Sequence, residues 1–127
     1  MVVEEILKDL GSPDSEVSIL LVDDAQITKI NKQYLNRNRP TNVISFSMRE
    51  GEFSGINPQL LGDVVISLER AKKEAKKKGN SLKNELNFLL VHGILHLLGY
   101  HHENCKKEAE NMRRKEEKLM KMIDEIK

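Results

Sequence analysis

Residues 81–102 read SLKNELNFLLVHGILHLLGYHH, and this stretch decides the fold. Ser81 is a typical N-cap residue and Gly99 is typical of the position just beyond a helix end, so a helix is predicted between them. Apolar side chains occur almost all the way round this helix, as is typical of a helix in the core. Because His92 and His96 belong to the same helix, the core is expected to carry a functional site.

Hydrophobic periodicity and turn residues predict the other elements of the chain. Asp23 and Gln26 have the spacing of a capping box, which places a helix start there. The predicted order indicates an α+β fold, with a small mixed β-sheet, packed helices and a site on the buried central helix. We expect helices at 2–10, 24–34, 67–78, 81–98 and 104–126, and strands at 16–22, 43–47 and 61–66.

Length and composition favour a single soluble domain over residues 1–127. Apolar residues make up 39% of the chain and charged residues 32%, with a net charge of +1. No apolar run reaches the roughly 18 residues of a membrane span, and the acidic start MVVEEILKDL differs from a signal peptide. The only cysteine, Cys105, has no internal disulfide partner. A cytoplasmic location is therefore predicted.

Three histidines have the spacing of a catalytic zinc site. His92 and His96 are one helical turn apart, so both imidazoles can reach one ion. A chain reversal at Gly99 would bring His102 back as the third ligand. Three protein ligands leave the fourth tetrahedral position for water, which indicates one catalytic zinc ion per chain and a metal-dependent hydrolase.

Two other interpretations of the histidines stay open. His92 and His96 would alternatively be core side chains satisfied by hydrogen bonds. A closed structural zinc site would take His101 or Cys105 as its fourth ligand. The metzincin proteases share this histidine spacing but carry a glutamate base after the first histidine. Gly93 stands at that position here, which argues against peptide hydrolysis by their mechanism.

Residues 92–102 resemble the histidine motif of the YbeY endoribonuclease family, His-Gly-x-Leu-His-Leu-x-Gly-Tyr-Asp-His. Residues 40–46, PTNVISF, and 61–67, LGDVVIS, are similar to two further segments of that family, in the same order. The resemblance extends over nearly the whole chain. It implies a zincin-like α+β fold, a zinc ion and a single-strand-specific RNA hydrolase that acts in maturation of small-subunit ribosomal RNA and in ribosome quality control. Single-stranded RNA, ribosomal RNA and ribosomal particles are then the expected partners.

Two positions depart from the family pattern. His101 stands where the family usually has aspartate, and Leu35 stands where it commonly has arginine. Both departures bear on the catalytic rate more than on metal binding. Arg37 and Arg39 are the candidate substrate-binding residues near Leu35, and no catalytic acid or base is assigned. The rival functions are a ribosome-assembly factor with weak or no catalysis and another zinc hydrolase, such as a metalloprotease or an amidase.

A lysine-rich stretch lies before the central helix. Arg70, six lysines and the single acidic residue Glu74 fall within residues 70–83. Such a basic group could contact RNA phosphates. A solvated helix face is the alternative that the charge pattern favours.

Overall fold

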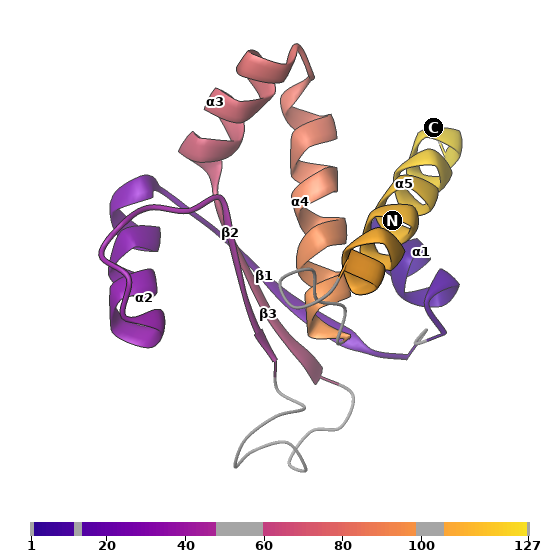
Figure 1. Cartoon of the computed structure of the whole chain (residues 1–127), viewed down its shortest axis with the longest axis horizontal. Helices are drawn as coiled ribbons and strands as arrows, with labels where there is room; N and C mark the ends of the chain where they lie inside the picture. Colours follow the sequence, from indigo (N-terminus) through magenta and orange to yellow (C-terminus); the bar gives the residue numbers. More distant parts are fainter. Residues whose placement is uncertain (1, 12–13, 48–59, 99–105, 127) are drawn as a thin grey trace.

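The computed structural model describes residues 2–11, 14–47, 60–98 and 106–126. These residues form five helices and one three-stranded sheet (Figure 1). The predicted element order and the α+β class are confirmed, with bounds that differ by one or two residues. The elements are α1 (Val2–Asp9), β1 (Glu16–Val22), α2 (Asp24–Leu35), β2 (Val43–Ser47), β3 (Leu60–Ser67), α3 (Leu68–Lys78), α4 (Leu82–Leu97) and α5 (Lys106–Ile126).

The sheet is mixed, as the sequence predicts. Its strand order is β1-β3-β2, with β1 parallel and β2 antiparallel to the central strand β3. Gly62 in β3 has a φ of 150°, and a Cβ there would overlap the Phe46 carbonyl oxygen of β2. This backbone conformation is open to glycine and closed to larger residues. Gly62 therefore permits the close pairing of β2 and β3 at this end of the sheet.

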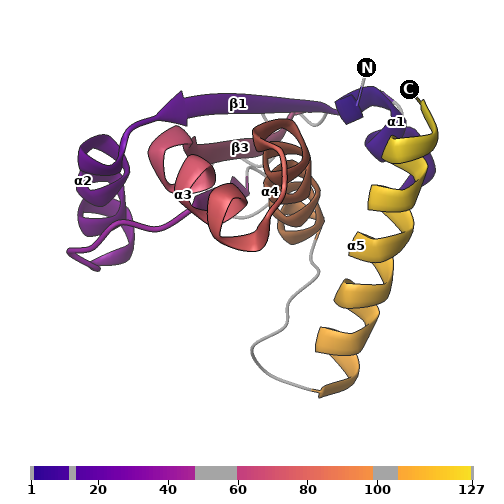
Figure 2. The ribbon, with the colours of Figure 1, turned by 90° about the horizontal axis from the view of Figure 1, so that it is seen from above.

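Helices pack against both faces of the sheet, while much of the edge strand β1 stays exposed. Alternate side chains of β3 point to opposite faces, so Val64 and Ile66 join the main core with Leu89 and Ile94 of α4. Val65 belongs to a smaller cluster with side chains of β1, β2 and α2. Figure 2 shows α2 at one end of the molecule and α5 at the other, with the sheet and α4 between them. The sheet and the flanking helices thus hold α4 in the core.

The helix caps confirm several sequence signals. The Asp23 carboxylate accepts from the Gln26 backbone N–H at 2.7 Å, and Gln26 Oε1 accepts from the Asp23 N–H at 3.1 Å. Ser81 Oγ caps α4 by accepting from Asn84 N–H at 3.0 Å. Gly79 ends α3 in the left-handed region, with φ 75°. The predicted stop at Gly99 lies outside the described residues, and α4 ends at Leu97 with Leu98 as its C-cap.

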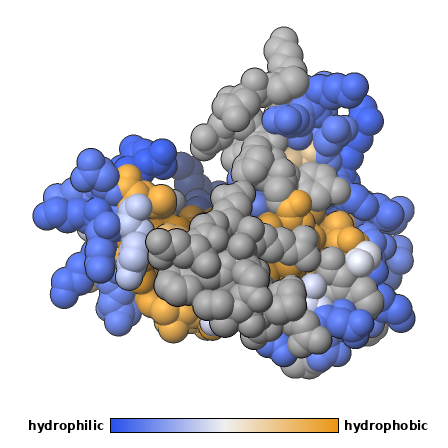
Figure 3. Space-filling view, turned by 90° about the horizontal axis from the view of Figure 1, so that it is seen from below, coloured by the Kyte–Doolittle hydropathy of each residue, from blue (hydrophilic) through white to orange (hydrophobic). Residues whose placement is uncertain are grey.

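Some large apolar side chains lie on the surface. Figure 3 shows apolar patches beside hydrophilic surface on one face of the molecule. In the described part of the chain, the exposed large apolar or aromatic residues are Ile19, Leu20, Leu21, Tyr34 and Leu35. Tyr34 packs edge-on against Phe46 of β2, with ring centroids 5.4 Å apart. The end of α2 is therefore anchored to the sheet although Tyr34 and Leu35 face solvent.

Candidate metal and substrate site

His92 and His96 meet on one face of α4. Their Nε2 atoms are 3.0 Å apart, and their ring centroids are 4.6 Å apart. Two nitrogens bound to one tetrahedral zinc at about 2.0–2.1 Å are roughly 3.3 Å apart. The pair therefore has nearly the separation of two ligands of one ion. The two side chains lie together, as their helical spacing predicts, and at 3.0 Å their Nε2 atoms are also within hydrogen-bond distance, as the alternative of hydrogen-bonded core histidines expects. The pair could hold a metal ion together, and a shared ion stays a prediction.

Glu116 of α5 contacts the other ring nitrogen of His92. The distance between His92 Nδ1 and Glu116 Oε1 is 3.2 Å, and the two side chains are 21% and 14% exposed. An ionised carboxylate only accepts hydrogen bonds, so Nδ1 carries the proton that it donates to Glu116. A neutral His92 then presents the lone pair of Nε2 toward His96. Metal-binding histidines commonly make this contact with a carboxylate.

Glycine at position 93 lets α4 approach the sheet closely. A Cβ on Gly93 would lie 2.7 Å from Val64 Cγ1 and 3.2 Å from Ser45 Oγ. Ser45 Oγ donates a hydrogen bond to the Gly93 carbonyl oxygen at 3.1 Å. Both β2 and β3 therefore fix the height and rotation of α4 at the residue that follows His92. Metzincins carry their glutamate base at the position of Gly93, and here Val64 and Ser45 occupy the space that such a side chain would need.

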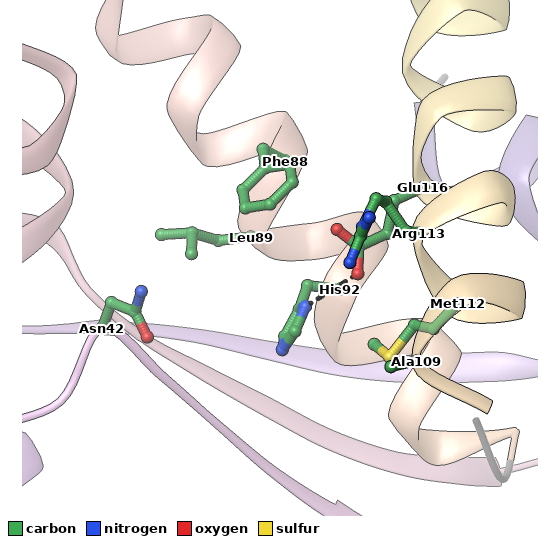
Figure 4. A pocket seen from close by; sticks show the side chains of 8 residues that line it. All are labelled: Asn42, Phe88, Leu89, His92, Ala109, Met112, Arg113 and Glu116. Atoms are coloured by element: carbon green, nitrogen blue, oxygen red, sulfur yellow. Dashed lines mark hydrogen bonds and ion pairs between the residues drawn. The ribbon is translucent and has the colours of Figure 1, made fainter. Parts of the chain in front are cut away.

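A pocket of about 260 Å³ opens beside His92 between α4 and α5 (Figure 4). Both helices contribute apolar and polar groups to its wall, and Asn42, the residue before β2, adds a further polar group. In Figure 4, His92 lies below Phe88 of its own helix, and the side chains of α5 approach it from the right. The lining residues are Asn42, Phe88, Leu89, His92, Ala109, Met112, Arg113 and Glu116.

The third predicted ligand, His102, lies outside the described residues, as do His101 and Cys105. Among the residues that the structure describes, no three histidine, cysteine or carboxylate side chains gather as metal ligands. The complete three-histidine set stays a prediction. The same holds for the closed site with His101 or Cys105 as a fourth ligand.

Arg37 and Arg39 lie exposed in the segment between α2 and β2. Asn31 fixes this segment at two points. Its carbonyl oxygen accepts from Arg37 N–H at 3.2 Å, and its side-chain amide donates to the Arg39 carbonyl at 2.9 Å. The segment leads to Asn42, which lines the pocket beside His92. A substrate-binding role for the two arginines stays a prediction.

The lysine-rich helix α3 is largely solvated. Five of its lysines, at positions 72, 73, 76, 77 and 78, are exposed in the structure. Lys78 Nζ lies 3.1 Å from Glu85 Oε2, and the Glu85 side chain is 1% exposed. The same ammonium lies 5.1 Å from the centroid of the Phe88 ring. Lys78 and Glu85 therefore form an ion pair beside the aromatic wall of the pocket.

Sequence reasoning missed Glu116, although a signal for it exists. Met112, Leu119 and Ile123 of α5 are buried, and their spacing of three to four residues marks the face that packs on the core. Glu116 continues that spacing as a carboxylate on the apolar face. A partly buried carboxylate at such a position is expected to have a hydrogen-bond partner, and His92 is that partner.

Taken together, the fold and the site define a small α+β protein with paired histidines on a buried helix and a pocket beside them. No helix in the described residues is long and apolar enough to cross a membrane. The model of the family described as endoribonuclease YbeY matches residues 1–124. The chain belongs to the endoribonuclease YbeY family.

Curated relatives and a solved structure agree with this assignment. The chain is 48% identical to endoribonuclease YbeY of Geobacter metallireducens, over 97% of this chain and 83% of that protein. It is 47% identical to endoribonuclease YbeY of Syntrophus aciditrophicus, over 95% of this chain and 76% of that protein. The solution structure of TM1509 from Thermotoga maritima matches with a TM-score of 0.66 and 30% identity, over 94% of this chain and 74% of that one.

Proposed function

We propose that this protein is a zinc-dependent endoribonuclease that cleaves single-stranded RNA during maturation of small-subunit ribosomal RNA. Membership of the endoribonuclease YbeY family supports the reaction class. The observation that carries the proposal is the 3.0 Å separation of the Nε2 atoms of His92 and His96. Ribosomal particles are the proposed setting and the cytoplasm is the proposed location.

His92, His96 and His102 are the proposed ligands of one zinc ion. The described pair fits such an ion, because zinc prefers neutral imidazole nitrogens and the contact with Glu116 keeps the His92 proton on Nδ1, so that the lone pair is on Nε2. His102 would come from the segment that connects α4 with α5. A zincin-like arrangement, with the ion held on the buried helix and just beyond it, follows from this ligand set.

When bound, zinc supplies a Lewis acid for the phosphoryl oxygen and makes a bound water more acidic. The chain itself supplies orientation and charge. Glu116 holds the ring and the tautomer of His92, while Ser45 and Val64 hold α4 against the sheet. Arg37 and Arg39 are proposed to contact RNA phosphates, since one guanidinium group can donate two parallel hydrogen bonds to two oxygens of the same phosphate.

The test is cleavage of a single-stranded ribosomal RNA segment by the zinc-loaded protein, with chelator and His96→Ala as comparisons. We expect cleavage by the loaded wild-type protein, and loss of cleavage in both comparisons. Metal analysis of His92→Ala, His96→Ala and His102→Ala proteins should show loss of stoichiometric zinc. Cleavage that survives both chelator and His96→Ala would contradict a catalytic role for this site.

An assembly factor with weak or no catalysis is the second candidate, favoured by Leu35. This apolar side chain is 45% exposed at the end of α2, where the family commonly has arginine. Binding of the protein to ribosomal particles without RNA cleavage would support that alternative. Leu35→Arg then separates the two candidates, because a catalytic site that lacks only this charge should gain rate from the substitution.

A further inference from the structure

The pocket between α4 and α5 has the character of a subsite for one flat ring. Phe88, Leu89 and Met112 form its apolar wall, while Asn42 and Arg113 supply polar groups. Its volume of about 260 Å³ is below the roughly 300–1,000 Å³ of pockets that enclose drug-sized molecules. A single nucleobase is an occupant of the right size and chemistry.

We infer that this pocket binds one unstacked nucleobase of the RNA strand, adjacent to the phosphate at the histidine pair. The inference rests on the proposed function and adds a substrate subsite to it. His92 belongs both to the pocket wall and to the histidine pair, so the two sites share a boundary. A base in the pocket is therefore a neighbour of the bond to be cleaved.

Phe88 is the stacking residue of this subsite. It lies one helical turn before His92, and the two ring centroids are 6.2 Å apart. Aromatic side chains bind successive bases of single strands by stacking, with little dependence on base identity. The ammonium of Lys78 lies 5.1 Å from the Phe88 centroid, and its ion pair with the buried Glu85 places it beside this ring. The combination of an aromatic ring with a nearby cation, which Arg113 of α5 supplies here, is typical of single-strand binding sites.

Arg113 is the phosphate-binding residue of the subsite. Its side chain is exposed and lines the pocket from α5 (Figure 4). The carboxylate in the same lining, that of Glu116, is hydrogen-bonded to His92. The Arg113 guanidinium can bind the phosphate that follows or precedes the buried base. The neighbouring Arg114 offers a matched control, because it is 77% exposed, ion-paired with Glu110 and absent from the pocket lining.

Preference for single strands follows from this arrangement. A base in a duplex is paired and stacked, and it has to leave the helix before it can enter a pocket of this size. Single-stranded RNA presents its bases without that cost. The subsite selects the strand state by geometry, and it needs no contact that identifies a particular base.

The test measures binding separately from cleavage. Chelator-treated protein is titrated into a labelled single-stranded RNA, and the dissociation constant is followed by fluorescence anisotropy. We expect Phe88→Leu to weaken binding on the order of tenfold. Arg113→Gln should weaken binding and lower the slope of log K against log salt by about 0.7. Arg114→Gln should leave both quantities unchanged, and thermal unfolding checks that each variant is folded.

An RNA series with one abasic nucleotide at successive positions sharpens the test. At one position the missing base should weaken binding by the wild-type protein and have no effect on Phe88→Leu. Wild-type affinity in both Phe88→Leu and Arg113→Gln would overturn the subsite. Cleavage of the same RNA by the zinc-loaded protein is measured in parallel. Lost cleavage with the expected binding pattern would count against the proposed function alone, whereas cleavage with unchanged binding would count against the subsite alone.

Discussion

The Nδ1 atom of His92 lies 3.2 Å from Oε1 of Glu116, which is 24 residues further along the chain. This contact connects the buried helix α4 with the C-terminal helix α5. It determines which nitrogen of His92 carries the proton, and so which nitrogen faces His96. The last helix of the chain is thereby part of the candidate site as well as of the core.

Replacement of Glu116 should weaken zinc binding. Loss of a carboxylate that orients a ligating histidine typically costs about 10- to 100-fold in metal affinity. We expect a loss of that size for Glu116→Leu, and a smaller one for Glu116→Gln, whose amide oxygen still accepts from Nδ1–H. Competition with a chromogenic chelator measures the affinity. The exposed neighbour Glu117 provides the control Glu117→Gln. Wild-type affinity in Glu116→Leu would show that the contact does not support the metal site.

Addition of one methyl group at Gly93 should destabilise the fold. Alanine favours a helix by about 1 kcal/mol over glycine, which opposes the effect. Overpacking against Val64 and Ser45 costs about 1–3 kcal/mol, so we expect Gly93→Ala to lower the free energy of unfolding by roughly 1 kcal/mol. Urea denaturation measures it. In a Val64→Ala background the cost should fall, and strict additivity of the two changes would argue against the contact.

Two glycines with positive φ provide a matched pair. Gly62→Ala should abolish cooperative folding or cost more than about 3 kcal/mol, because it combines backbone strain with an overlap on the Phe46 carbonyl. Gly79 has φ 75° and open space around it, so Gly79→Ala should cost only about 1–2 kcal/mol. Thermal unfolding of both proteins measures the difference. Equal losses would mean that the overlap at Gly62 is relieved by a small shift of β2.

The buried carboxylate of Glu85 should depend on Lys78. Without the ammonium, the carboxylate loses its ionic partner while it stays out of water. We expect Lys78→Met to lower the free energy of unfolding by about 1–3 kcal/mol. Lys77→Met, one residue earlier on the exposed part of α3, should change it by less than about 0.5 kcal/mol. A double variant, Lys78→Met with Glu85→Leu, should recover most of the loss, and denaturant titration of all three proteins checks this.

Local signals in the sequence were sufficient for the elements of this fold. The Asp23 capping box, the Ser81 cap and the Gly79 helix end act over three or four residues, so each can be recognised in the sequence. The apolar surface of α4 likewise predicts its burial. The spacing of His92 and His96 within one helical turn made their convergence predictable for the same reason.

Contacts between distant segments were not predictable in the same way. The pairing of β1 with β3 depends on the competition between strands for a central position, and no short pattern encodes its outcome. The Glu116 contact and the pocket require the docking of α5 on α4. Even there, the carboxylate between Met112 and Leu119 marks a partly buried polar position, although the identity of its partner comes from the tertiary structure.

The close packing of α4 against β3 at Gly93 has an evolutionary consequence. Acquisition of a glutamate next to His92, the residue that metzincin-type chemistry needs, requires a side chain where Val64 and Ser45 already lie. A single substitution of Gly93 by glutamate would destabilise the packing of α4 on the sheet, whatever its effect on catalysis. A glutamate at position 93 would need compensating substitutions in both β2 and β3 to make room for its side chain. The packing of α4 on the sheet therefore opposes the evolution of a metzincin-type active site in this family.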